Sequence, residues 1–103
     1  MSDESQIVVP RSFFEVFVPP GKVKPSETRE VIAARYELCE DLAQMLTDTA
    51  QSRLFELGVA EQDVLERMHQ GLLADAALVT ADEARWVIRR LAELLGWPPL
   101  GTP

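Results

Sequence analysis

The chain has 103 residues, 47% of them hydrophobic and 26% charged, which is enough for one folded domain and unlike the composition of disordered chains. Its net charge of −7 would repel phosphate backbones and anionic headgroups, so nucleic acids and membrane surfaces are unfavourable partners. The single cysteine excludes an internal disulfide and, with it, a disulfide-stabilised secreted fold.

Residues 1–6 are acidic and polar, which predicts a flexible tail. They lack the basic and apolar stretches of a signal peptide, and no apolar run reaches the roughly 20 residues that cross a bilayer. A cytoplasmic location is therefore expected. We predict a single helical domain over residues 7–97 and a second flexible tail over residues 98–103.

Residues 10–18 carry three of the four phenylalanines. Phe13, Phe14 and Phe17 follow helical spacing, and proline is tolerated at a helix start, so a short helix is predicted; the β-branched and aromatic content leaves a strand as the alternative. Pro19-Pro20-Gly21 then predicts a tight turn with positive φ at the glycine.

A long helix is predicted over residues 27–57, with Ser26 as its N-cap and Gly58 just beyond its end. Apolar residues keep a helical phase throughout, over about 45 Å at 1.5 Å per residue. Helix propensity is weakest at Thr47-Asp48-Thr49, so a bend there is the alternative to one continuous helix.

Two shorter helices follow. The first is predicted over residues 61–70 and ends at Gly71, and the apolar stretch 72–79 predicts a buried connection or a very short strand. The second covers residues 81–95, since Thr80 and Glu83 form a capping box and Gly96 is a terminator. The fold class is therefore all-α, with three to four helices around a single core.

Patterns for catalysis and cofactor binding are weak. Gly21-Lys22 lacks the rest of a phosphate-binding loop, and His69, the only histidine, has Glu66 but no second Glu-x-x-His step to complete a metal site.

Cys39 falls on an apolar helix face, where burial would quench a nucleophile. A cluster of acids, Glu37, Glu40 and Asp41, would supply a proton donor only if one pKa were raised; a solvated surface is favoured. We expect no enzyme activity, metal or cofactor.

Leu57-Gly58-Val59-Ala60, followed by Val64, has the spacing of a helix-turn-helix motif. The helix after the turn, however, begins with three acids among Glu61 to Glu66, which would face the DNA backbone. DNA binding is therefore an alternative function that the charge disfavours.

Candidate partner-binding residues lie near the last helix. Arg85, Arg89 and Arg90 form the only basic cluster, and Trp86 and Trp97 are of the type enriched in binding hot spots. A contiguous exposed apolar patch that included these tryptophans or the N-terminal phenylalanines would mark a binding surface.

Four segments, Val9-Pro10-Arg11-Ser12-Phe13, Val18-Pro19-Pro20-Gly21, residues 34–41 and Leu94-Leu95-Gly96-Trp97, resemble a group of small, uncharacterised proteobacterial proteins of about this length. Some of these carry the automatic label "ATPase with chaperone activity". The resemblance implies association with a chaperone, since the chain has no phosphate-binding loop. The function expected from the residues is a small cytosolic adaptor or regulatory domain that binds a protein partner.

Overall fold

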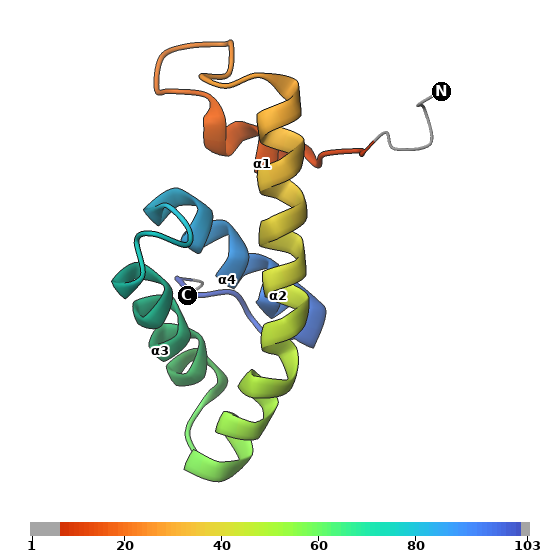
Figure 1. Cartoon of the computed structure of the whole chain (residues 1–103). Coiled ribbons are helices and arrows are strands. Elements are labelled where there is room, and N and C mark those ends of the chain that lie inside the picture. Colours follow the sequence, from red (N-terminus) through yellow and green to blue (C-terminus); the bar gives the residue numbers. More distant parts are fainter. Residues whose placement is uncertain (1–6, 102–103) are drawn as a thin grey trace. The chain divides into compact units, whose positions relative to one another are not determined.

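The computed structural model describes residues 7–101, and those residues form helices without any strand. The elements are α1 (Arg11–Phe14), the 3-10 helix η2 (Glu15–Phe17), α2 (Arg29–Leu57), α3 (Glu61–Ala74) and α4 (Ala81–Leu95) (Figure 1). The all-α class with three to four helices is confirmed. The tail predicted over residues 1–6 and the last two residues of the tail predicted over 98–103 lie outside the described residues.

Internal contacts divide the chain into two compact units, Met1–Leu38 and Cys39–Pro103, here called the first and second units. The division falls within α2, whose helical backbone continues through it. The sequence predicted one domain over residues 7–97, so a boundary inside the longest helix was not expected. Each unit has its own local architecture.

In the first unit, the carbonyl of Pro10 accepts the N–H groups of Phe13 and Phe14 at 3.1 and 3.0 Å and so starts α1. The short helix predicted over residues 10–18 is confirmed and the strand alternative is wrong: residues 11–14 are α-helical, and residues 15–17 form the 3-10 helix η2. Phe13 is fully buried and packs against the rings of Phe17 and Tyr36, each with a centroid distance of 5.6 Å.

The predicted tight turn is confirmed. The Lys22 N–H donates to the Pro19 carbonyl at 3.0 Å, and Gly21 has a φ of 79°, which glycine adopts without strain. The Ser26 N–H then donates to the Phe17 carbonyl at 2.6 Å, which closes the loop between η2 and α2.

That loop-closing bond places Ser26 outside the helix, so its prediction as the N-cap of α2 was wrong. Thr28 caps α2 instead: its Oγ1 accepts the Val31 N–H at 3.2 Å. The helix continues to Leu57, so the prediction of one continuous helix through residue 47 is confirmed. The Thr47 hydroxyl donates to the Gln44 carbonyl at 2.8 Å, which satisfies this weak helix former within the helix itself.

In the second unit, Gly58 ends α2 as predicted, with a φ of 66° and its N–H donating to the Leu54 carbonyl at 3.1 Å. The predicted end of α3 at Gly71 was wrong, because the helix continues to Ala74. Gly71 keeps a helical φ, and the next residue, Leu72, is buried and holds this turn against the unit. Of the stretch 72–79, predicted to be a buried connection or short strand, only Leu72 and Val79 are buried, and no part is a strand.

The predicted bounds of α4 are confirmed at both ends. Thr80 Oγ1 accepts the Glu83 N–H at 3.1 Å while a Glu83 carboxylate oxygen accepts the Thr80 N–H at 2.9 Å. At the other end Gly96 has a φ of 73°, and the Trp97 N–H donates to the Ala92 carbonyl at 2.9 Å. The capping box and the turn at Gly96 each satisfy some of the backbone groups that a helix end leaves without an intrahelical partner.

Candidate functional site: an apolar groove in the first unit

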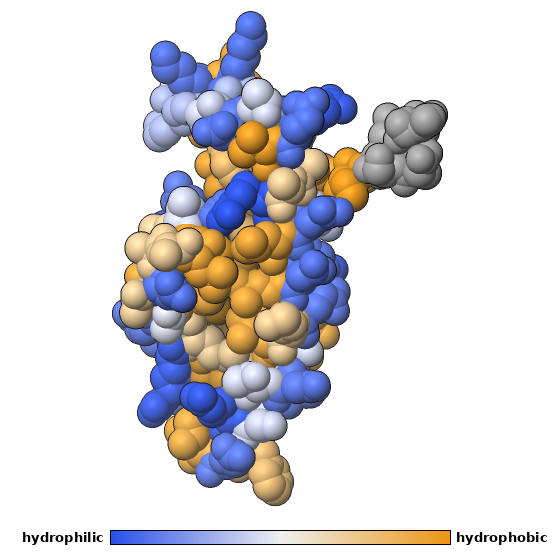
Figure 2. Space-filling view, viewed as in Figure 1, coloured by the Kyte–Doolittle hydropathy of each residue, from blue (hydrophilic) through white to orange (hydrophobic). Residues whose placement is uncertain are grey.

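Large apolar side chains remain exposed in both units, and Figure 2 shows such side chains among the charged residues on one face. The first unit exposes Ile7, Val8, Phe14, Val23 and Val31, and the second exposes Met45, Phe55, Leu57, Leu73 and Leu78. Extended apolar surface on a folded protein is a common mark of an interaction site. In the first unit some of this surface is concave.

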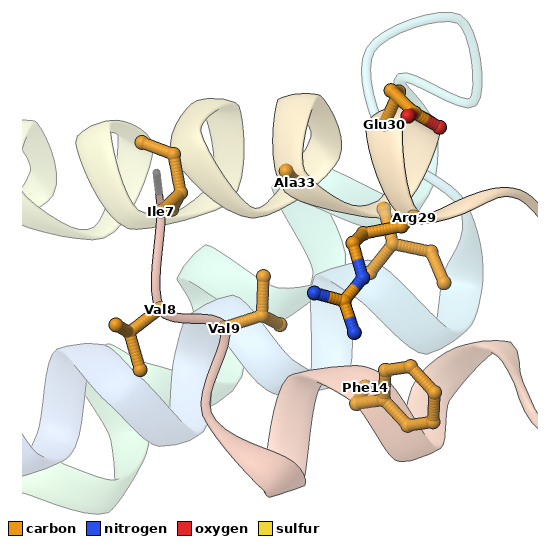
Figure 3. A pocket seen from close by; sticks show the side chains of 8 residues that line it. Ile7, Val8, Val9, Phe14, Arg29, Glu30 and Ala33 are labelled. Atoms are coloured by element: carbon orange, nitrogen blue, oxygen red, sulfur yellow. The ribbon is translucent and has the colours of Figure 1, made fainter. Parts of the chain in front are cut away.

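A cavity of about 560 Å3 opens on the first unit (Figure 3). We call it the N-terminal groove. Six of its eight lining residues are apolar, and the set is Ile7, Val8, Val9, Phe14, Arg29, Glu30, Ile32 and Ala33. Its volume lies within the range of about 300–1,000 Å3 that ligand sites occupy.

One wall of the N-terminal groove comes from α1 and the extended residues before it. Burial of Phe13 fixes the orientation of α1, and Phe14, the next residue along the helix, is left 37% exposed and lines the groove. The other wall is the first turn and a half of α2. There Ile32 is buried at the floor, and the small side chain of Ala33 leaves the space open.

Two charged residues at the start of α2 line the groove. In Figure 3 the Arg29 guanidinium lies between Val9 and Phe14, whereas the Glu30 carboxylate points away from them. Within the described part of the chain, Arg29 makes no hydrogen bond or ion pair. The groove therefore combines apolar walls with an available cation.

The backbone beside the groove is also available. Residues 7–9 are extended, and within residues 7–101 their N–H and carbonyl groups make no hydrogen bond. In Figure 3 the side chains of Ile7 and Val9 point toward α2, while that of Val8 points away. This alternation is that of a β-strand, and it leaves Val8 87% exposed.

The partner-binding residues suggested by the sequence all belong to the second unit, and none of them lines the groove. Trp86 is only 7% exposed, so its ring is packed inside the unit and is not a surface side chain. Trp97 is half-buried, and Arg89 is exposed. Arg85 is exposed and pairs with Asp82 at 2.9 Å one helical turn away. The residue pattern therefore missed the groove, although the N-terminal phenylalanines pointed to its location.

The acidic cluster on α2 has a structural role at Glu40. Its two carboxylate oxygens accept the Nε and Nη2 groups of Arg90 on α4 at 2.9 and 3.0 Å. This double hydrogen bond holds the pKa of Glu40 below its ordinary value, although partial burial opposes the shift. The raised pKa that a proton donor would need is therefore contradicted at Glu40.

Cys39 is fully buried, as expected for a core residue. Among residues 7–101, no three His, Cys, Asp or Glu side chains are grouped to hold a metal ion. Residues 58–60 join α2 to α3 in a helix-turn-helix connection, and the exposed positions of α3 include Asp63, Glu66 and Arg67. The charge on α3 is acidic, as the sequence indicated.

The chain matches no protein-family model, and comparison with curated proteins and with solved structures gives no match. Among the described residues, none of the helices has the length and apolar character that crossing a membrane requires. The resemblance to small proteobacterial proteins stays a prediction. The N-terminal groove is therefore the feature of this chain that bears on its function.

Proposed function

We propose that this chain is a protein–protein interaction domain, an adaptor or regulatory subunit without catalysis, and that it binds an apolar segment of its partner in the N-terminal groove. The observation that supports this proposal is the groove itself, a concave surface with six apolar lining residues. Exposed apolar side chains of this kind are costly in water and gain free energy when a partner covers them.

The free energy available at the groove is modest. Burying one exposed valine or phenylalanine side chain contributes about 1.5–3 kcal/mol, and Val8 and Phe14 are 87% and 37% exposed. Ordering both partners opposes this gain. We therefore expect reversible binding of a short segment rather than a permanent complex, which suits a regulatory subunit.

Two neighbouring alanines on α2 provide a matched test. Ala33 lines the groove, whereas Ala34 is exposed outside it. In A33W the indole would fill the groove, and in A34W it would project into solvent. Affinity purification from native lysate with the wild-type chain and both variants should recover a partner that A33W loses and A34W retains. The partner is then purified, and its binding to all three chains is measured by calorimetry.

The calorimetry decides the proposal. A partner that binds A33W and the wild-type chain with the same Kd would contradict the assignment of the groove. Equal thermal stability of A33W and A34W is the control that attributes any loss to the groove and not to unfolding.

A further inference from the structure

We infer that the segment bound in the N-terminal groove is an extended, acidic peptide of the partner protein, which pairs as a β-strand with residues 7–9 and places a carboxylate on Arg29. This inference rests on the proposed function and specifies the ligand. Three features of the first unit carry it: the extended backbone, the available guanidinium and the charge of the unit.

The backbone feature indicates the conformation of the ligand. Residues 7–9 are extended and their N–H and carbonyl groups have no partner in the described structure. Such an edge accepts an added strand, whose main chain supplies affinity while alternate side chains supply specificity. An added strand would direct alternate apolar side chains toward Phe14 and Ala33. Pro10 limits this pairing to a short segment, because proline cannot donate to a ladder.

The charge features indicate the chemistry of the ligand. Arg29 is the basic group of the groove lining, and its guanidinium can bind a carboxylate through two parallel hydrogen bonds. Residues 7–38 contain five basic and four acidic side chains, whereas residues 39–101 contain five basic and eleven acidic ones. With Asp3 and Glu4 included, the first unit has a net charge of −1, against −6 for the second unit. An acidic ligand is therefore repelled less at this end of the chain.

An amphipathic small molecule such as a fatty acid offers the same carboxylate and apolar chemistry. Sites for such molecules enclose about 70–90% of the ligand surface. Here Ile7 is 39% exposed and Val8 87% exposed, so the wall on that side would leave an alkyl chain largely in water. A peptide strand needs contact on one edge and one face only, and the groove supplies both.

Fluorescence anisotropy with defined peptides tests the inference on the full chain. The probe is the fluorescein-labelled peptide Ser-Glu-Leu-Val-Leu-Glu-Ser, and the comparison peptides replace both glutamates with lysine or with glutamine. We expect the acidic peptide to bind about fivefold more tightly than the neutral one, as one partly solvated ion pair implies, and the lysine peptide to bind most weakly.

A charge reversal makes the test specific to Arg29. In R29E the preference should invert, so that the lysine peptide binds more tightly than the acidic one. Glutamate is favourable in the first turn of a helix, so α2 should tolerate the change. The matched control is R53E, at an exposed arginine of the second unit that does not line the groove, and it should leave the order of affinities unchanged.

A backbone-methylated form of the acidic peptide tests strand addition. Methyl groups on alternate amides remove the N–H donors of one edge and block pairing while side chains stay the same. We expect at least a tenfold loss of affinity, equivalent to about 1.4 kcal/mol. Equal binding of methylated and unmethylated peptides would overturn strand addition.

The remaining outcomes are also decisive. Equal affinity for the acidic and lysine peptides, or no binding of any peptide while A33W still abolishes partner binding, would overturn this inference and leave the proposed function intact. Dodecanoate that competes with the partner at the groove and binds without the peptides would assign the site to a lipid. The F55S variant removes the exposed Phe55 ring. If the chain self-associates and F55S abolishes the self-association, the groove would be assigned to a second copy of this chain.

Discussion

At the scale of single residues, Glu40 and Arg90 form the most specific polar contact described in the second unit. The exposed fractions of their side chains are 18% and 32%, so water screens the pair only in part. Replacement by E40Q removes the charge but keeps the shape. We expect the free energy of unfolding at pH 7 to fall by about 1–2 kcal/mol, measured by urea denaturation.

The same pair has a defined pH dependence. Because the folded-state pKa of Glu40 is lowered, its stabilisation is present above the unfolded-state pKa of about 4.3 and is lost as pH falls through the folded value. The stability difference between wild type and E40Q should therefore be constant near neutral pH and shrink below about pH 4. E37Q, which alters an exposed carboxylate on the same helix, is the control and should change stability at pH 7 by less than about 0.5 kcal/mol.

Cys39 provides a reporter of local opening. Its side chain is fully buried, so a thiol reagent reaches it only when α2 opens. We expect the native chain to react with Ellman's reagent at least about 100-fold more slowly than the urea-unfolded chain, since opening at a core position costs about 3 kcal/mol or more. A34C in a C39S background places the thiol on the exposed surface and should react at once. A fast native reaction at Cys39 would contradict its burial.

Some single-residue features could be predicted from the sequence and others could not. Burial of Cys39 could be predicted because the residues before and after it in the same helix define an apolar face that includes Cys39. The groove could not be predicted, because it depends on residues 7–9 lying beside Ile32 and Ala33, more than twenty positions later in the chain. Periodicity describes one element at a time and carries no information about such contacts. Trp86 shows the opposite error, since the residue type suggested a surface hot spot and the packing buries it.

At the scale of elements, two glycines with different conformations give a matched prediction. Gly96 has a φ of 73°, whereas Gly71 is helical, and an added Cβ would meet no atom within 4 Å at either position. The backbone conformation alone should therefore determine how alanine at each position changes the free energy of unfolding. G96A should destabilise the chain by about 1–2 kcal/mol, and G71A should stabilise it by about 0.5–1 kcal/mol, as thermal denaturation would show. Changes of the same sign at both positions would contradict these conformations.

This pair also explains which helix bounds could be predicted. The end of α4 was predicted correctly because Gly96 coincides with the end of the apolar stripe and is followed by two prolines. Gly71 is also a glycine, but it does not end α3. Glycine inside a helix costs only about 1 kcal/mol, and burial of Leu72 offsets that cost. The start of α2 was misplaced by two residues for a similar reason. Both Ser26 and Thr28 are good caps, and the hydrogen bond from Ser26 to Phe17 decides between them.

At the scale of the whole molecule, the two units differ in how much apolar surface they bury. Of the buried apolar side chains in the described structure, Phe13 and Ile32 belong to the first unit, and all the others belong to the second. We expect amides of α1 and η2 to exchange with solvent through openings of lower free energy than those of α4. Native-state hydrogen exchange measures this directly. Equal protection of α1 and α4 would show that the chain opens as one cooperative unit.

The loop closed by the Ser26 and Phe17 hydrogen bond has a practical consequence. Lys22 and Val23 are exposed within it, so trypsin should cut after Lys22, while Pro25 protects the bond after Lys24. The N-terminal peptide formed by this cut would contain residues 7–9, Phe13 and Phe14, and packing of Phe13 against Tyr36 would keep it bound to the rest of the chain. A nicked chain that stays folded could exchange this peptide for a synthetic one, so that one wall of the groove is rebuilt by fragment complementation.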